Sequence, residues 1–164
     1  METYHQTVEK IITLLNENNC WHETFEHKPV RTSEEAVKTR PGYTLKQGAK
    51  ALIVRVKIPN QGKSFLMLVF PADKKFDNDK LKKLVEAKET RFATEEEVSD
   101  LTNGIQPGGV PPFGNLFGLK VIVDKTLLLN EKIVFNAGDR SFSIAMRSQD
   151  YKELVNPLIG DIVL

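Results

Sequence analysis

The hydrophobic positions of this chain switch between helical and extended spacing. Residues 5–18 place apolar side chains three and four positions apart, which predicts an amphipathic helix. Alternation over residues 21–27 then predicts a short strand. The segment Thr32-Ser33-Glu34-Glu35 has the pattern of a capping box, so a second helix is expected to begin there and to end at Pro41-Gly42.

The clearest strand runs from Lys50 to Ile58, and a turn at residues 60–63 follows it. The next run, Ser64–Phe70, is almost continuously apolar, which indicates a strand buried on both faces. Together the two strands predict a central hairpin. The apolar residues that share one face of the first strand are Leu52, Val54, Val56 and Ile58.

Lys50 has the parity of that apolar face and stands at the start of the strand. An ammonium group there costs desolvation energy unless an anion or a polar ligand meets it, which favours a functional role. The alternative is a lysine at the rim, whose stem packs on the core while its head reaches water.

The second half of the chain predicts alternating helices and strands. A helix is expected from Asp77 or Asn78 to about Ala87, then a short strand over 91–93. A capping box at 94–97 begins another helix that Gly104 ends. Strands at 120–123, 133–136 and 141–146 and a last helix after Ser148 complete the series. We therefore expect an α+β fold: one mixed α/β domain over residues 1–164, with a mainly antiparallel central sheet and flanking helices.

Composition narrows the function classes. The net charge of +1 over 164 residues excludes a strongly basic protein that coats nucleic acid. Cys20 is the single cysteine, and the three histidines show no metal-ligand spacing, so neither a metal nor another cofactor is expected. The polar N-terminus and the absence of a long apolar run predict a soluble, cytoplasmic protein without membrane contact. Six lysines between 74 and 88 are mixed with acidic residues, as in a solvated helix face or a phosphate-contacting edge.

A glycine- and proline-rich loop spans residues 104–114. Adjacent glycines let backbone N–H groups approach a ligand closely, and such a loop can bind an oxyanion or a phosphate. It is not a P-loop, because no Gly-Lys-Ser/Thr follows. A purely structural turn is the alternative.

Two segments together resemble the YbaK/prolyl-tRNA-synthetase-associated editing domain family. One is Gly48-Ala49-Lys50-Ala51-Leu52-Ile53-Val54, and the other is Gly108-Gly109-Val110-Pro111-Pro112-Phe113-Gly114, followed later by Asn136-Ala137-Gly138. The segment 27–36 also looks familial. The resemblance covers nearly the whole chain, in the same order. It assigns the family's key lysine to Lys50 and its Gly-x-x-x-Pro loop to residues 108–112.

The resemblance implies a free-standing, monomeric trans-editing deacylase. Such proteins hydrolyse the ester joining a wrong amino acid to the 3′ end of a tRNA, and members act on alanine, cysteine, serine or threonine esters, often on proline tRNA. The implied partner is the acceptor end of a mischarged tRNA, with an aminoacyl-tRNA synthetase as a further candidate.

The same comparison supplies the expected site. We expect Lys50 to hold the ester end of the substrate, and the N–H groups of Gly108 and Gly109 to receive the carbonyl oxygen as charge develops. The residues expected to bind the substrate are His27, Thr32, Pro112, Asn136, Ala137 and Gly138.

Two departures from the family pattern bear on the substrate. The cysteine-specific branch has Ser-Gly-Gly with an aspartate seven residues after its serine, whereas this chain has Asn136-Ala137-Gly138 and Ser143. The alanine-specific branch has asparagine directly after the lysine, where this chain has Ala51. The flanking segments look more like the branches that clear serine or threonine. The main alternative is a module that captures aminoacyl-tRNA or a synthetase without hydrolysis; another is a hydrolase or transferase for small esters.

Overall fold

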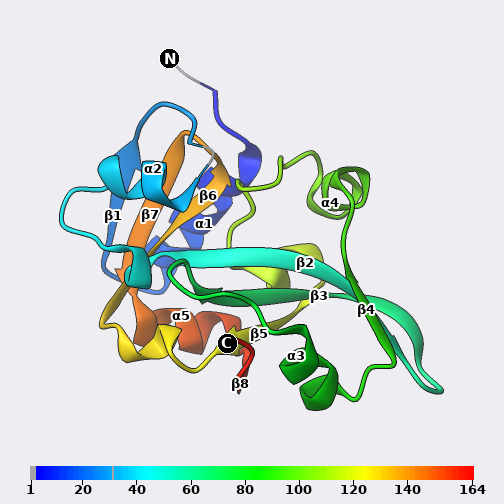
Figure 1. Ribbon diagram of the computed structural model, residues 1–164. Helices are drawn as coiled ribbons and strands as arrows, with labels where there is room; N and C mark the ends of the chain where they lie inside the picture. Colours follow the sequence, from blue (N-terminus) through cyan, green and yellow to red (C-terminus); the bar gives the residue numbers. More distant parts are fainter. Residues whose placement is uncertain (1–2, 31) are drawn as a thin grey trace.

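A long β-hairpin lies at the centre of the fold. In the computed structural model, which describes residues 3–30 and 32–164, the hairpin extends away from a smaller sheet (Figure 1). The helices are α1 (Gln6–Glu17), α2 (Ser33–Lys38), α3 (Asn78–Val85), α4 (Glu95–Thr102) and α5 (Ser148–Val155), with short 3-10 turns η1 (Leu45–Gln47), η2 (Gly114–Phe117) and η3 (Leu127–Leu129). The strands are β1 (His22–Glu26), β2 (Ala49–Ile58), β3 (Gly62–Pro71), β4 (Glu89–Phe92), β5 (Lys120–Asp124), β6 (Lys132–Asp139), β7 (Phe142–Arg147) and β8 (Leu158–Gly160).

The described strands form two sheets. One is antiparallel with the order β1-β7-β6, and the other has the order β4-β2-β3-β5-β8. In the larger sheet β2 pairs antiparallel with β3 and β4, whereas β3–β5 and β5–β8 are parallel pairs. The α+β class and the mainly antiparallel pairing are thus confirmed. The strands are divided between two sheets because β6 and β7 pair with β1, and Gly48, directly before β2, forms an isolated bridge with Val134 of β6.

The hairpin separates two hydrophobic cores. Met67 and Val69 of β3 face the larger core, which α1 and α5 cover, while Leu66 and Leu68 face the smaller one beside α3. The expectation of burial on both faces is confirmed for residues 66–70, whereas Ser64 at the start of the predicted strand is exposed. Leu52 packs on the smaller core. Lys50 lies two positions before Leu52 on β2, so its side chain is on the same face of the strand, where that apolar face ends.

Helix caps follow the expected chemistry. The Thr32 side chain accepts a hydrogen bond from the Glu35 N–H (3.1 Å) and begins α2. Thr94 and Glu97 form a complete capping box at α4, and Asp77 caps α3. These caps fix where each helix begins, and residues of α2 and of the start of β2 line the same cavity.

The loop over residues 104–114 is tied into the larger core. Phe113 is fully buried and packs against the rings of Phe135 (5.5 Å) and Tyr151 (5.6 Å). The Tyr151 hydroxyl donates to the Pro112 carbonyl (2.8 Å). The C-terminal half of the loop is therefore structural, and its exposed residues are Gly104 and residues 106–108.

Candidate active site

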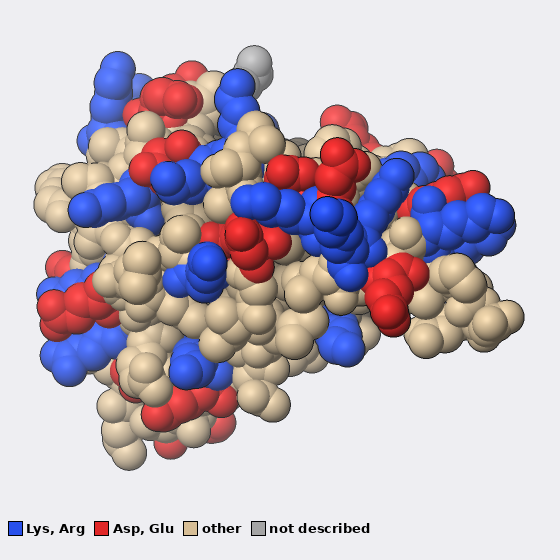
Figure 2. All heavy atoms as spheres, turned by 60° about the horizontal axis from the view of Figure 1, so that its bottom comes forward, with Lys and Arg blue, Asp and Glu red and all other residues tan. Residues whose placement is uncertain are grey.

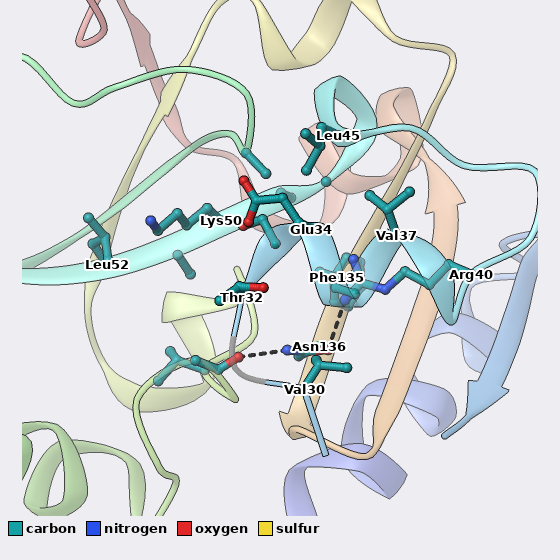
Figure 3. Close-up of a pocket in the computed structure, with 18 of the residues that line it drawn as sticks. Val30, Thr32, Glu34, Val37, Arg40, Leu45, Lys50, Leu52, Phe135 and Asn136 are labelled. Carbon is teal, nitrogen blue, oxygen red and sulfur yellow. Dashed lines mark hydrogen bonds between the residues drawn. The ribbon is translucent and has the colours of Figure 1, made fainter. Parts of the chain in front are cut away.

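An open cleft lies where the two sheets meet, with a volume of about 500 Å³ (Figure 3). Its lining comes from α2, the start of β2, the segment after β3, the glycine loop and β6. That volume lies in the range of small-molecule sites. The polar and charged side chains that line it are Thr32, Ser33, Glu34, Arg40, Lys50, Lys74, Lys75 and Asn136.

One part of the cleft, here called the lysine side, consists of Lys50, Lys74 and Lys75. All three residues are exposed. Their ammonium groups form no hydrogen bond or ion pair with any residue that the structure describes. Figure 3 shows Lys50 extending from β2 beside the opening, away from Arg40. The lysine side is therefore able to receive an anionic group without breaking an existing contact.

Charge elsewhere is more evenly mixed. Figure 2 shows Lys and Arg interspersed with Asp and Glu over the face that it displays. This matches the net charge of +1 and leaves no extended basic area on that face. Attraction of an anionic ligand would thus depend on a few local lysines.

The other part of the cleft, here called the loop side, consists of Arg40, Gly108 and Asn136. The Arg40 Nη2 donates to Asn136 Oδ1 (2.8 Å), and the Asn136 Nδ2 donates to the Gly108 carbonyl (2.7 Å; Figure 3). Arg40 is only 6% exposed, and burial lowers the pKa of its guanidinium to about 10, so it remains charged at neutral pH. Unlike the lysine side, the loop side is held by hydrogen bonds before any ligand arrives.

Ser143 supports the loop side from behind. It pairs directly with Asn136 across β6 and β7, and its Oγ accepts from the Arg40 Nε (3.0 Å). The same oxygen lies 2.8 Å from the His27 Nε2, whose ring also contacts the Lys28 carbonyl through Nδ1 (2.9 Å). His27 therefore lies behind the cleft lining rather than in it.

Gly109 does not present its N–H to the cleft. That group donates to the Gln106 carbonyl (2.9 Å), and Gly109 lines a separate cavity of about 530 Å³ near His5 and Arg140. The expectation that both glycine N–H groups face the substrate is therefore wrong for Gly109. Gly108 does line the cleft, in a left-handed conformation with φ +89°.

Three further expected substrate contacts lie away from the cleft. Ala137 is fully buried in the larger core, and Pro112 is held by Tyr151. Gly138 donates its N–H to the Gly109 carbonyl (2.8 Å), and a Cβ there would lie 2.8 Å from Cβ of Thr7. These residues shape the glycine loop, while Lys50, Gly108, Thr32 and Asn136 are the predicted residues that line the cleft together.

The sequence reasoning missed Arg40 and Glu34. Arg40 precedes Pro41-Gly42, a place where arginine is usually exposed, so no local signal marked its burial. Glu34 was noted only as part of a capping box, yet it is the one acidic side chain among the described residues that line the cleft. Its position in the first turn of a helix that covers the site is a signal that could have been used.

The described residues contain neither a metal-ligand cluster nor a membrane-spanning helix. No cluster of three or more His, Cys, Asp or Glu side chains is placed to hold a metal ion in that part of the chain. Across residues 3–30 and 32–164, no helix has the length and apolar character needed to cross a membrane.

Known proteins are similar to this chain in sequence. The model of the aminoacyl-tRNA editing domain matches residues 27–154. The chain is 30% identical over 152 residues to the multifunctional Ser/Thr-tRNA deacylase ProXp-y of Escherichia coli strain K12, covering 92% of this chain and 89% of that protein. It is 26% identical over 119 residues to the proline–tRNA ligase of Ralstonia pickettii strain 12J, covering 73% of this chain but only 21% of the ligase.

Solved structures share the fold. The hypothetical protein APE2540 superposes with a TM-score of 0.80 at 25% identity, over 94% of this chain and 99% of that one. A candidate trans-editing enzyme for prolyl tRNA synthetase gives 0.80 at 22% identity, over 99% of both chains. The editing-domain match takes in every residue that lines the cleft, and this chain belongs to the aminoacyl-tRNA editing domain family.

Proposed function

We propose that this protein is a free-standing deacylase that hydrolyses the ester between a wrongly attached amino acid and the 3′ end of a tRNA, with serine and threonine as its preferred amino acids. One observation carries the proposal: Lys50, without a partner among the described residues, shares a cleft with the hydrogen-bonded Asn136–Gly108 pair. The 30% identity to a Ser/Thr-tRNA deacylase supports the choice of amino acid. The reaction would take place in the cytoplasm, where aminoacyl-tRNA is used.

Lys50 is proposed to hold the ester end of the substrate. An aminoacyl ester is already activated, so positioning and charge stabilisation suffice for hydrolysis. A water oxygen adds to the carbonyl carbon, the bond to the ribose oxygen breaks, and a proton from the water passes to that ribose oxygen. The products are a free amino acid and an uncharged tRNA. The Lys50 ammonium would contact the terminal phosphate, ribose or carbonyl oxygen during this step.

The loop side is proposed to stabilise the oxyanion. An asparagine amide carries two N–H donors, and Asn136 uses one of them for the Gly108 carbonyl. Its second N–H and the N–H of Gly108 are the donors that we assign to the developing negative charge. This replaces the assignment of Gly109, whose N–H already donates to Gln106.

Glu34 is proposed to bind the α-ammonium group of the substrate. That group would enter a cleft lined by three lysines and Arg40, where like charges repel it. Glu34 is the one carboxylate among the described lining residues and is exposed, so it can offset this repulsion. An ester whose amino group is acylated would lose this contact.

The test is a panel of esters on proline tRNA: seryl, threonyl, alanyl, cysteinyl and the correct prolyl ester. We expect wild type to release serine and threonine fastest and to leave the prolyl ester intact. Lys50→Ala should lower kcat/KM at least 100-fold, equivalent to about 2.7 kcal/mol of transition-state stabilisation. Lys63→Ala, which removes another exposed lysine near the start of β3, should match wild type.

The alternatives give different results. Failure of folded wild type to hydrolyse any ester would reject the deacylase, and co-elution with tRNA or a synthetase would then favour a binding module. Equal turnover of tRNA esters and the matching amino acid ethyl esters would instead favour a hydrolase for small esters. Hydrolysis of alanyl or cysteinyl esters alone would correct the substrate but retain the reaction.

A further inference from the structure

Arg40 is a buried cation with neutral partners. Its guanidinium donates to Asn136 Oδ1 and Ser143 Oγ, and no carboxylate of a described residue lies within ion-pair distance. Burying a charge without a counter-charge costs several kcal/mol, and apolar side chains of similar volume often serve stability equally well. Folding stability alone therefore does not explain an arginine at this position.

The hydrogen bonds around Asn136 have one consistent arrangement. A guanidinium can only donate, and a backbone carbonyl can only accept. The Asn136 oxygen must therefore face Arg40, and its nitrogen must face Gly108. With the amide reversed, two donors would oppose each other at Arg40, and two acceptors would oppose each other at Gly108. The Arg40 guanidinium and the Gly108 carbonyl thus agree on which way the amide points, and the Ser143 hydroxyl also donates to the Asn136 oxygen (3.1 Å). Arg40 is the charged donor among these partners.

Asn136 in turn holds the exposed part of the glycine loop at Gly108. Gly108 is exposed and has φ +89°, and its carbonyl receives the Asn136 Nδ2. The adjacent Gly109 is held separately, through the Gly138 N–H and the Gln106 carbonyl. The contact from Asn136 is therefore the one that ties Gly108 itself to β6.

We propose that Arg40 is a positioning residue that orients the Asn136 amide and, through it, fixes Gly108 at the cleft. Arg40 does not touch the reacting atoms; it keeps the second N–H of Asn136 and the N–H of Gly108 directed at one point. This inference rests on the proposed function, because that point is where the ester oxyanion is placed.

The variant Asn136→Asp distinguishes a role of the Asn136 amide in turnover from a role in folding stability alone. The aspartate gives Arg40 a counter-charge, which strengthens their contact, but it removes the N–H donors that Gly108 and the oxyanion need. We expect an unchanged or higher Tm, a fall in kcat on seryl-tRNA of at least tenfold, and a KM within twofold of wild type. Asn18→Asp is the matched control, because Asn18 also donates to a backbone carbonyl but lies at the end of α1.

The variant Arg40→Met is the second test of the positioning role. Methionine fills similar space and removes both the charge and the donors, so we expect retained stability together with at least a tenfold fall in kcat. Wild-type kcat in either folded variant would overturn the positioning role. If Arg40→Met does not fold, the result for Asn136→Asp decides.

Amide hydrogen exchange tests the position of the loop without measuring ester hydrolysis, so the failure of one proposal can be told from the failure of the other. In both variants the backbone N–H groups of residues 108–110 should exchange faster than in wild type, while those of α5 should not change. Unchanged exchange at 108–110 overturns the inference even if wild type is active. If wild type hydrolyses no ester but exchange rises as expected, the proposed reaction fails and the positioning of the loop stands.

Discussion

The lysine side and the loop side of the cleft differ in how much of their geometry exists before substrate arrives. Lys50, Lys74 and Lys75 are exposed and have no partner among the described residues, whereas Asn136 is fixed between Arg40 and Gly108 by bonds of 2.8 and 2.7 Å. The long lysine side chains lose conformational entropy when they bind a ligand, whereas the side chains of Arg40 and Asn136 have already lost theirs on folding.

This difference suits two tasks. The end of a tRNA is a flexible polyanion, and mobile ammonium groups can follow it without demanding one geometry. A developing oxyanion is a small target that benefits from donors fixed in place, because such donors need no reorganisation during the reaction. Substitutions on the loop side should therefore lower kcat, and a substitution that strains the loop backbone should lower stability as well. Substitutions on the lysine side should alter activity or binding alone.

The largest combined effect is expected at Gly108. Gly108→Ala places a Cβ on a backbone with φ +89°, where the nearest atom outside the neighbouring residues is the Arg140 Cδ at 3.7 Å, so strain rather than a clash is the cost. Strain of this kind costs about 1–2 kcal/mol. We expect a lower urea midpoint and a fall in kcat of about tenfold, because relief of the strain moves the N–H.

Gly62→Ala is the matched control for Gly108→Ala. Gly62 has φ +76° with open space around its Cβ position, and it is the first residue of β3, outside the cleft. The two variants should lose similar stability, but only Gly108→Ala should lose turnover. Equal kcat in both would separate the loop from the reaction.

The next effect in size concerns Glu34. Glu34→Gln should lower kcat/KM on seryl-tRNA about fivefold, the scale of one partly solvated ion pair. On N-acetyl-seryl-tRNA, which lacks the α-ammonium group, the same substitution should change nothing. The control Glu96→Gln alters the equivalent position of α4. A fivefold loss on both esters would show that Glu34 acts on something other than the ammonium group.

A smaller effect is expected from the outer lysines. Replacing Lys74 and Lys75 with alanine should raise KM about threefold and leave kcat within twofold, because these groups would contact phosphates rather than the ester. A plot of log kcat/KM against log salt concentration should become less steep by about 1–2. Alanine at Lys82 and Lys83, on α3 outside the cleft, is the comparison. An unchanged salt dependence would remove the outer lysines from the tRNA contact.

Local chemistry was the part of this molecule that the sequence predicted well. The caps at Thr32, Asp77 and Thr94, and the strand buried on both faces, depend on neighbouring residues and were correctly placed. The parallel pairs and β8 were missed. The three residues of β8 are too few for a period to be read, and two of them have exposed apolar side chains.

The site was predicted less evenly for a related reason. Lys50 could be placed because strand parity sets where a side chain points. Which glycine N–H faces the cleft depends on hydrogen bonds between residues far apart in sequence, such as Gly138 to Gly109. The burial of Arg40 depends likewise on Asn136 and Ser143, about a hundred positions away. Such contacts leave no spacing pattern around the residues that make them.

The smallest effect is expected far from both sides, at the start of α4. The Arg91 guanidinium binds the Glu97 carboxylate through both oxygens (2.7 and 2.9 Å), the Thr94 N–H also donates to it, and these contacts lower the pKa of Glu97 from 4.5 to about 2. A carboxyl whose pKa is lower in the folded state stabilises the fold above its unfolded pKa. That contribution disappears as the pH falls from 4.5 towards 2.

Glu97→Gln should therefore reduce the free energy of unfolding at neutral pH, and the gap from wild type should close between pH 4.5 and 2. Because the pair is at the surface, the reduction should be modest and should shrink in high salt. Urea titrations across that pH range, beside Glu96→Gln, measure it. Turnover at neutral pH should stay at the wild-type value, since α4 does not line the cleft. A change in kcat would mean that loss of the α4 cap shifts Gly108 through the loop that follows α4. The position of the loop side would then depend on α4 as well as on the hydrogen bonds of Asn136.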